Sequence, residues 1–198
     1  GNTALDPEIT DNIEISFILK NKYSINTFFS YTKDPISKGF IVGENDRILV
    51  FPMNLSSNIT WGLRLGSGSL NPYPWWQINT NISMLSKWFK WSINGKEESN
   101  HRVTSSINLN NQFRLPKGWG AEITGYYNGK LAEGQSVIYP MWMLSAGIRK
   151  NILDNNGTVR LVVNDIFSSF RFKTDIFSPA QFGRTSETED NQYIGISC

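Results

Sequence analysis

Hydrophobic and polar residues alternate with a period of two over much of this chain. The clearest case is VTSSINLNNQF, residues 103–113, where Ile107 and Leu109 alternate with Asn108 and Asn110. Successive side chains of a β-strand point to opposite faces, whereas a helix would repeat its apolar positions every three to four residues. The pattern therefore predicts a strand with one apolar face and one face that is polar but uncharged.

The same alternation recurs along the chain. In WQINTNISM, residues 76–84, Ile78 and Ile82 alternate with Asn79 and Asn81. Most segments of this kind are about ten residues long, the length that a tilted strand needs to cross a membrane. The pattern predicts about nine strands, at residues 12–20, 23–31, 57–69, 76–84, 103–113, 119–130, 140–152, 158–167 and 190–198.

The links between the predicted strands alternate in length. Short links rich in turn-forming residues are predicted at 20–22, 71–75, 115–118 and 153–157. Longer links are predicted at 34–47, about 89–101, about 130–139 and about 168–189. Short turns at one end of a sheet and long loops at the other are typical of outer-membrane barrels, whose short turns are periplasmic and whose long loops are external.

Together these patterns favour an all-β, antiparallel transmembrane β-barrel. The alternative is a soluble β-sandwich, but that fold normally buries its apolar face and carries Lys and Glu outside. Charge is scarce on both faces of several strands here, which favours the barrel over the sandwich.

The side chains predicted to face lipid are Ile13, Ile15, Phe17, Ile78, Ile82, Ile107, Leu109, Leu161 and Val163. Those predicted to face the lumen are Asn79, Asn81, Asn108, Asn110 and Gln112.

Aromatic residues concentrate near the predicted strand ends. The residues expected in two aromatic girdles at the membrane–water interfaces are Trp75, Trp76 and Trp119 beside short turns, and Tyr31, Trp88, Trp91, Tyr126 and Tyr127 toward the long loops. Amphipathic rings favour such interfaces because one part prefers hydrocarbon and the polar edge prefers water. The Trp-rich hairpin 75–91 could instead stack sugar rings, but its Trp residues lie at strand ends and form no central platform.

Composition excludes several classes of protein. The formal net charge is +2, from 19 Lys and Arg against 17 Asp and Glu, which gives no indication of nucleic-acid binding. With only Cys198 and His101, the chain can form neither an internal disulfide nor a multi-histidine metal site. No apolar run is long enough for a membrane helix. We expect no cofactor, and the absence of a leader sequence suggests a mature or internal fragment.

Candidate catalytic residues are few. Glu122 and Glu133 could serve as a carboxylate pair for glycoside hydrolysis, but solvated charges are the favoured interpretation. His101 with Ser105 lacks the context of a nucleophile elbow. The glycines at 66 and 68 lack the Lys and the helix of a phosphate-binding loop. We therefore do not expect an enzyme.

Asp165 follows an apolar strand in RLVVNDIFSSFRF, residues 160–172. Val159, Leu161 and Val163 would face lipid, and strict alternation would place Asp165 on the same face. A charge is tolerated there only near the interface or where a bulge redirects it. We expect Asp165 to be a structural residue at the barrel rim, hydrogen-bonded to backbone or a neighbouring loop.

The following polar segment, residues 174–192, becomes acidic toward its end. It suits either a mobile external loop or a loop that gates a ligand or contacts a partner.

Several segments resemble one known family, in order along the chain. They are NTALDPEITDNIEISF at 2–17, FFSYTKDPIS at 28–37, NLSSNITWGLRL at 54–65, FRLPKGWGAEITGYYNGK at 113–130 and LSAGIRKNILDNNGTVRLVVNDIFSSFRF at 144–172. The first resembles the segment that precedes a late barrel strand in TonB-dependent receptors. The others are similar to successive stretches of the outer-membrane β-barrel family of Bacteroidetes.

The resemblance implies that residues 1–198 form the C-terminal portion of one barrel domain in the outer membrane of a Gram-negative bacterium. The whole barrel would have roughly 22 strands, with a plug domain and N-terminal strands outside this chain. It would import a nutrient or metal complex. Expected partners are outer-membrane lipid, the TonB energising system, the barrel-assembly machinery and a lipoprotein or surface complex. Family members end in an aromatic residue, whereas this sequence ends in Cys198. We therefore expect either that the sequence stops a few residues before the natural C-terminus or that the protein is an unusual member of the family.

Two other functions stay open at this point. One is a non-transporting outer-membrane barrel that acts as a scaffold in a surface complex. The other is a soluble, secreted, glycan-binding β module that uses its Trp and Tyr residues.

Overall fold

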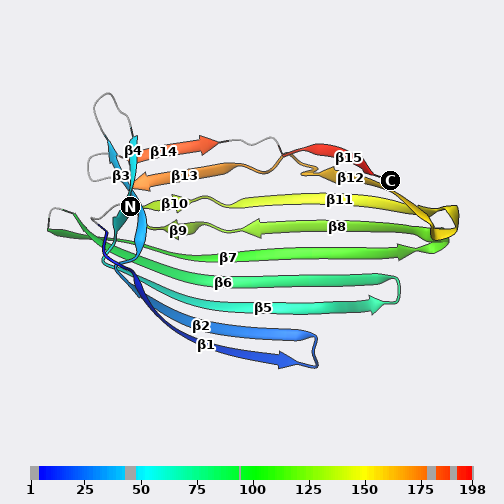
Figure 1. Cartoon of the computed structure of the whole chain (residues 1–198), viewed down its shortest axis with the longest axis horizontal. Helices are drawn as coiled ribbons and strands as arrows, with labels where there is room; N and C mark the ends of the chain where they lie inside the picture. The colour runs from blue at the N-terminus through cyan, green and yellow to red at the C-terminus, as the bar shows by residue number, and fades with distance from the viewer. Residues whose placement is uncertain (1–4, 43–47, 94, 178–181, 188–190, 198) are drawn as a thin grey trace.

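The computed structural model describes residues 5–42, 48–93, 95–177, 182–187 and 191–197. Most of these residues belong to one antiparallel sheet of nine strands, in the order β1-β2-β5-β6-β7-β8-β11-β12-β15 (Figure 1). Its strands are β1 (Ile9–Leu19), β2 (Tyr23–Lys33), β5 (Ser57–Tyr73), β6 (Trp76–Ile93), β7 (Lys96–Leu115), β8 (Trp119–Asn128), β11 (Met141–Ile152), β12 (Gly157–Asn164) and β15 (Tyr193–Ser197). The nine strands predicted from the alternating pattern correspond to these nine.

The main sheet, which comprises these nine strands, is open. Each strand pairs with its neighbours in the given order, so β1 and β15 form its two edges. The longest ladder joins β6 and β7 and runs from the pair Trp76–Phe113 to the pair Ile93–Lys96.

The predicted link at 89–101 is wrong. Strand β6 continues to Ile93 and β7 begins at Lys96, so most of that segment is paired strand. The hairpin closes at Gly95, whose φ of 76° is readily adopted only by glycine. The alternation of Phe89, Trp91 and Ile93 continues the strand pattern beyond the predicted end.

The other long stretches between the predicted strands contain further strands that the sequence pattern did not predict. Strands β3 (Ile36–Val42) and β4 (Ile48–Asn54) form a two-stranded sheet. A four-stranded sheet has the order β14-β13-β10-β9. Its strands are β9 (Leu131–Glu133), β10 (Ser136–Ile138), β13 (Phe172–Phe177) and β14 (Phe182–Glu187). These elements gather at the end of the main sheet opposite the short turns (Figure 1).

The short turns follow local backbone rules. Lys20 and Asn21 connect β1 to β2 with φ of 52° and 51°, and Leu153 and Asp154 connect β11 to β12 with φ of 51° and 50°. Two successive left-handed residues match the twist of the flanking strands and give tight hairpins. The main sheet therefore has compact turns at one end, as predicted.

The buried apolar core of the described residues is small. Leu55, Phe89, Trp91 and Ala132 form one cluster, with Met53 and Ile93 packed against it. This cluster lies where β9 contacts β6 and β7. Trp91 is only 4% exposed, so the prediction that it belongs to an interfacial girdle is wrong. Trp88 and Trp91 are three residues apart on β6, and side chains separated by an odd number of residues point to opposite faces of a strand.

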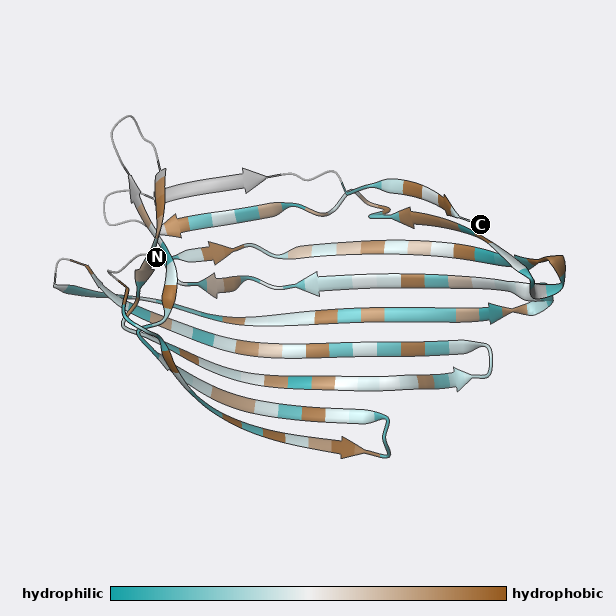
Figure 2. Cartoon of the chain, in the orientation of Figure 1, coloured by the Kyte–Doolittle hydropathy of each residue, from teal (hydrophilic) through white to brown (hydrophobic). Residues whose placement is uncertain are grey.

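Large apolar side chains of the main sheet are instead exposed. Ile13 is 67% exposed, Ile15 66% and Ile82 41%. Figure 2 shows the alternation of hydrophobic and hydrophilic residues along these strands. Soluble monomers rarely expose contiguous apolar patches of this kind, which mark membrane or protein contacts.

Candidate functional site

Cross-strand pairing divides the main sheet into two chemically different faces. Ile82 pairs with Ile107, whereas the adjacent pair joins Asn81 to Asn108. Directly opposite residues of an antiparallel ladder share a face. We call the face with Ile82 and Ile107 the apolar face, and the face with Asn81 and Asn108 the polar face.

The apolar face extends across all nine strands. One row passes from Phe17 through Ile25 and Leu65 to Ile82. At the other edge, Leu161 pairs with Ile148 and Ile196. All the residues predicted to face lipid lie on this face: Ile13, Ile15, Phe17, Ile78, Ile82, Ile107, Leu109, Leu161 and Val163. Their contact with lipid stays a prediction.

The polar face carries the residues predicted to face a lumen. Asn79, Asn81, Asn108 and Asn110 line one hollow together with Tyr126. Tyr126 is paired with Asn108 and so lies on the polar face, which makes its expected place in an outer girdle wrong. Gln112 lines a neighbouring hollow, nearer the short turns. The structure thus brings the five predicted lumen residues onto one face of adjacent strands.

The aromatic residues near the short turns form a continuous stack. Tyr73, Trp75, Trp76 and Phe113 have ring centroids 5.5–6.4 Å apart for the contacting pairs, with interplanar angles of 9–28°. Trp119 lies beside the next short turn, with the Lys150 ammonium 5.2 Å from its ring centroid.

Trp88 lies on the apolar face at the opposite end of β6, against the ring of His101. Tyr31 shares this face and end, because Tyr31 pairs with Ile59 and Ile59 pairs with Trp88. Twelve residues separate Trp76 from Trp88 on β6, which is about 40 Å along a strand. A tilt of about 45° reduces this to about 28 Å, close to the roughly 25 Å apolar band of outer-membrane barrels.

Charged residues cluster on the polar face near the short turns. Arg114, Glu122, Arg149 and Arg160 line the hollow that also contains Gln112. Arg160 forms an ion pair with Glu122. The sequence pattern could not show this cluster, because its members come from four strands whose register is not readable from one sequence.

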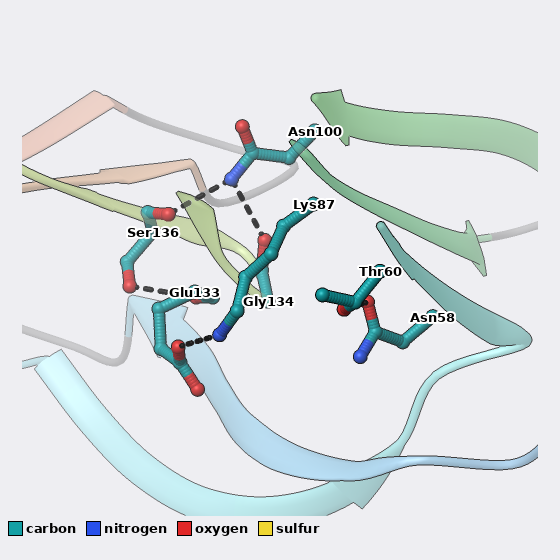
Figure 3. Close-up of polar contacts among 7 residues, drawn as sticks. All are labelled: Asn58, Thr60, Lys87, Asn100, Glu133, Gly134 and Ser136. Carbon is teal, nitrogen blue, oxygen red and sulfur yellow. Dashed lines mark hydrogen bonds and ion pairs between the residues drawn. The ribbon is translucent and has the colours of Figure 1, made fainter. Parts of the chain in front are cut away.

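A second polar cluster lies at the long-link end of the sheet (Figure 3). The Asn100 side-chain amide, which is 4% exposed, donates to the carbonyl oxygens of Gly134 at 2.9 Å and Ser136 at 2.8 Å. Lys87 contacts the Glu133 carboxylate at 3.3 Å. These bonds fasten the β9–β10 hairpin to β6 and β7. Glu133 pairs with Lys87 at this end of the sheet, whereas Glu122 pairs with Arg160 near the short turns, so the structure does not bring these two carboxylates together.

Asp165 lies immediately after β12 and is 1% exposed. Its φ of 45° places it in the left-handed region, which ends the strand and redirects its side chain. The carboxylate accepts hydrogen bonds from the Ser169 amide (2.9 Å), the Ser169 hydroxyl (2.9 Å) and the Phe170 amide (3.1 Å). Burial acts to raise the pKa of Asp165, but these hydrogen bonds outweigh it and hold the pKa below its ordinary value.

Other chemistry is sparse in the described parts of the chain. His101 contacts the Ser86 hydroxyl at 3.0 Å, with no nucleophile–base–acid arrangement around it. Within the described ranges, no group of three or more His, Cys, Asp or Glu residues is placed to hold a metal ion. Nor does any helix in those ranges have the length and apolarity to cross a membrane, a result that does not bear on crossing by strands.

Comparison with known protein families identifies the class of protein to which this chain belongs. A model of the outer membrane protein beta-barrel family matches residues 1–198. The chain belongs to this family. It is therefore an outer-membrane protein, as the sequence predicted, and the apolar face has a lipid environment available to it. A comparison with curated proteins finds no match, and a comparison with solved structures finds none either.

Proposed function

We propose that this chain forms part of the wall of a barrel that imports a nutrient or metal complex with energy from the TonB system. The observation that carries the proposal is the middle of the polar face of β6 and β7, where short uncharged side chains leave a hollow lined by Asn79, Asn81, Asn108 and Asn110. Small barrels fill their interior with side chains, whereas wide barrels enclose water or a plug. A face of short amides suits the second arrangement.

The open edges of the sheet favour a larger barrel. In lipid, every backbone N–H and C=O must be hydrogen-bonded within the protein. The outer edges of β1 and β15 have no neighbour in the main sheet. We propose that further strands pair with both edges, and that residues 1–198 form the C-terminal portion of a barrel of roughly 22 strands.

The second candidate function is a scaffold barrel that transports nothing. The hairpin β3–β4 favours it, because Ile36, Leu49 and Val50 are exposed at the long-link end and suit contact with a lipoprotein or surface-complex partner. A soluble, secreted glycan-binding module is not retained, because the chain belongs to an outer-membrane family. Neither retained candidate requires a catalytic reaction.

Uptake by cells distinguishes the two candidates. The gene for the complete protein is deleted and restored, and uptake of labelled ferric citrate and labelled oligosaccharides is measured with and without a protonophore. Energised import predicts uptake that depends on the gene and is abolished by the protonophore. Gene-dependent uptake that survives the protonophore would indicate a passive pore, and uptake independent of the gene for every probe would favour the scaffold.

Orientation of the two faces needs a separate measurement. In a Cys198→Ser background of the complete protein, single cysteines are introduced at Ile107 and at Asn108. The barrel assignment predicts that a water-soluble maleimide labels position 108 and leaves position 107 unlabelled in membranes. Equal labelling at both positions would contradict the assignment of the apolar face to lipid.

A further inference from the structure

Three arginines lie in one cross-strand row on the polar face. Arg114 pairs with Gly120, Gly120 pairs with Arg149, and Arg149 pairs with Arg160. The row therefore crosses β7, β8, β11 and β12 and places Arg149 and Arg160 at directly opposite positions of the ladder. Like charges in directly opposite positions destabilise a sheet, so this arrangement needs a compensating interaction.

The described residues supply only part of that compensation. Glu122 forms its ion pair with Arg160. Arg114 contacts the side-chain oxygen of Gln77, at 3.5 Å. No acceptor within the described ranges binds the Arg149 guanidinium. Three positive charges and one negative charge therefore line the hollow and leave two positive charges in excess.

Two glycines shape this hollow. A Cβ atom on Gly120 would lie 2.7 Å from Nε of Arg149, and a Cβ atom on Gly147 would lie 2.9 Å from the Glu122 carboxylate oxygen. Real Cβ atoms essentially never approach so closely, so larger residues would displace both side chains. The glycines let Arg149 and Glu122 lie close against the sheet. Arg149 is nevertheless exposed to solvent.

We propose that Arg114, Arg149 and Arg160 form a binding site for an oxyanion, a carboxylate or phosphate group, on the polar face near the short turns. Guanidinium groups bind both anions through paired N–H donors. The oxyanion would occupy the hollow beside Arg149 and offset the repulsion between Arg149 and Arg160. It comes either from a free solute or from acidic side chains of the same complete protein that lie against this face.

Thermal unfolding of the complete protein in detergent tests the site. Inorganic phosphate and citrate are titrated at constant ionic strength into the wild type, Arg149→Gln and the control Arg102→Gln. Arg102 shares strand β7 and the polar face with Arg114 but lies toward the opposite end of the strand. For a free solute, we expect saturable stabilisation of the wild type and the control. Arg149→Gln should weaken the apparent affinity about tenfold or more, the effect of losing a charge-assisted hydrogen bond.

The direction of the stability change identifies the source of the oxyanion. If phosphate and citrate have no effect but Arg149→Gln lowers the melting temperature, the protein's own carboxylates occupy the site. The proposal is overturned if neither anion binds and Arg149→Gln raises the melting temperature or leaves it unchanged. In that case the arginines repel one another and no bound oxyanion offsets the repulsion. The inference rests on the proposed inward orientation of the polar face, which the labelling of position 108 tests separately.

Discussion

At the scale of single residues, Asp165 illustrates how backbone conformation overrides a sequence pattern. Strict alternation places it on the apolar face with Val163, where an unpaired charge would be costly. The left-handed φ of 45° ends the alternation at Asn164 and turns the carboxylate toward the backbone of Ser169 and Phe170. Aspartate adopts this conformation more readily than most residues.

Replacing Asp165 should destabilise the turn after β12. Asp165→Ala leaves the backbone amides of Ser169 and Phe170 without their acceptor, whereas the Ser169 hydroxyl can still donate to the Trp142 carbonyl oxygen. We expect a loss of about 2–3 kcal/mol in the free energy of unfolding. Asp165→Asn keeps one acceptor oxygen and tolerates the left-handed backbone, so its loss should be smaller. Urea unfolding of the complete protein in lipid vesicles measures both. An unfolding free energy of Asp165→Ala equal to that of the wild type would contradict the structural role.

The contribution of Asp165 should also depend on pH in one direction. Its folded-state pKa lies below the ordinary value of 3.8, so its stabilisation is fully present above that value and is lost as the pH falls through the folded-state pKa. The difference in unfolding free energy between wild type and Asp165→Ala should therefore be constant near neutral pH and shrink only in strongly acidic solution. A difference that already shrinks near pH 6 would exclude this carboxylate as the titrating group.

Asn100 connects strand β7 to the β9–β10 hairpin through two hydrogen bonds. Its amide donates to two backbone carbonyls of that hairpin, and the loss of two buried hydrogen bonds costs about 1–3 kcal/mol. We expect Asn100→Ala to increase the rate of amide hydrogen exchange in residues 131–138 about tenfold, with little change in β11. Asn108→Ala on the same strand and face is the matched control. Unchanged exchange in residues 131–138 would refute the role of Asn100.

At the scale of elements, the sequence predicted the main sheet better than the small ones. Eight of the nine strands of the main sheet have eight residues or more, and their period-two pattern is a local signal. Strands β9 and β10 have only three residues each. They are stabilised by partners far along the chain, such as Asn100 and Leu55. A local pattern of hydrophobic and polar residues does not indicate contacts between residues that are far apart in the sequence.

The extent of β6 and β7 was missed for a related reason. Lys96, Glu97 and Glu98 have the composition of a loop, yet they pair with Ile93, Ser92 and Trp91. Beyond the membrane both faces of a strand can be polar, so charge does not end a strand there. Likewise, the polar face was predictable from alternation, but the arginine row was not, because it requires the register of four strands.

The two faces of β7 should respond differently to the same charge. Ile107→Lys places an ammonium group on the apolar face in the middle of the strand, and we expect a loss of about 2–4 kcal/mol in the free energy of folding into vesicles. Asn108→Lys, one position further, places it on the polar face and should cost much less. Folding titrations of the two variants measure the difference. Equal losses would show that the two faces do not differ in environment.

At the scale of the whole molecule, the odd number of strands in the main sheet limits how the sheet can close into a barrel. In an antiparallel sheet of nine strands, the first and last strands run in the same direction, as β1 and β15 do (Figure 1). Direct closure would therefore create a parallel pair. Single-chain bacterial outer-membrane barrels have an even number of antiparallel strands. Both edges consequently favour partners outside the main sheet, which is the physical argument for a larger barrel.

Cysteine cross-linking in the complete protein tests this closure. In the Cys198→Ser background, one cysteine replaces Gly195 in β15, and a second is moved through Asn12, Glu14 and Ser16 in β1. These β1 positions share the polar face with Gly195, because Asn12, Glu14 and Ser16 pair with Ser30, Phe28 and Asn26 and Gly195 pairs with Val162. We expect no disulfide at any position, whereas the control pair Glu14→Cys with Phe28→Cys, on directly paired residues, should cross-link. A disulfide between β1 and β15 would mean that the nine strands close on themselves, and the larger barrel would have to be abandoned.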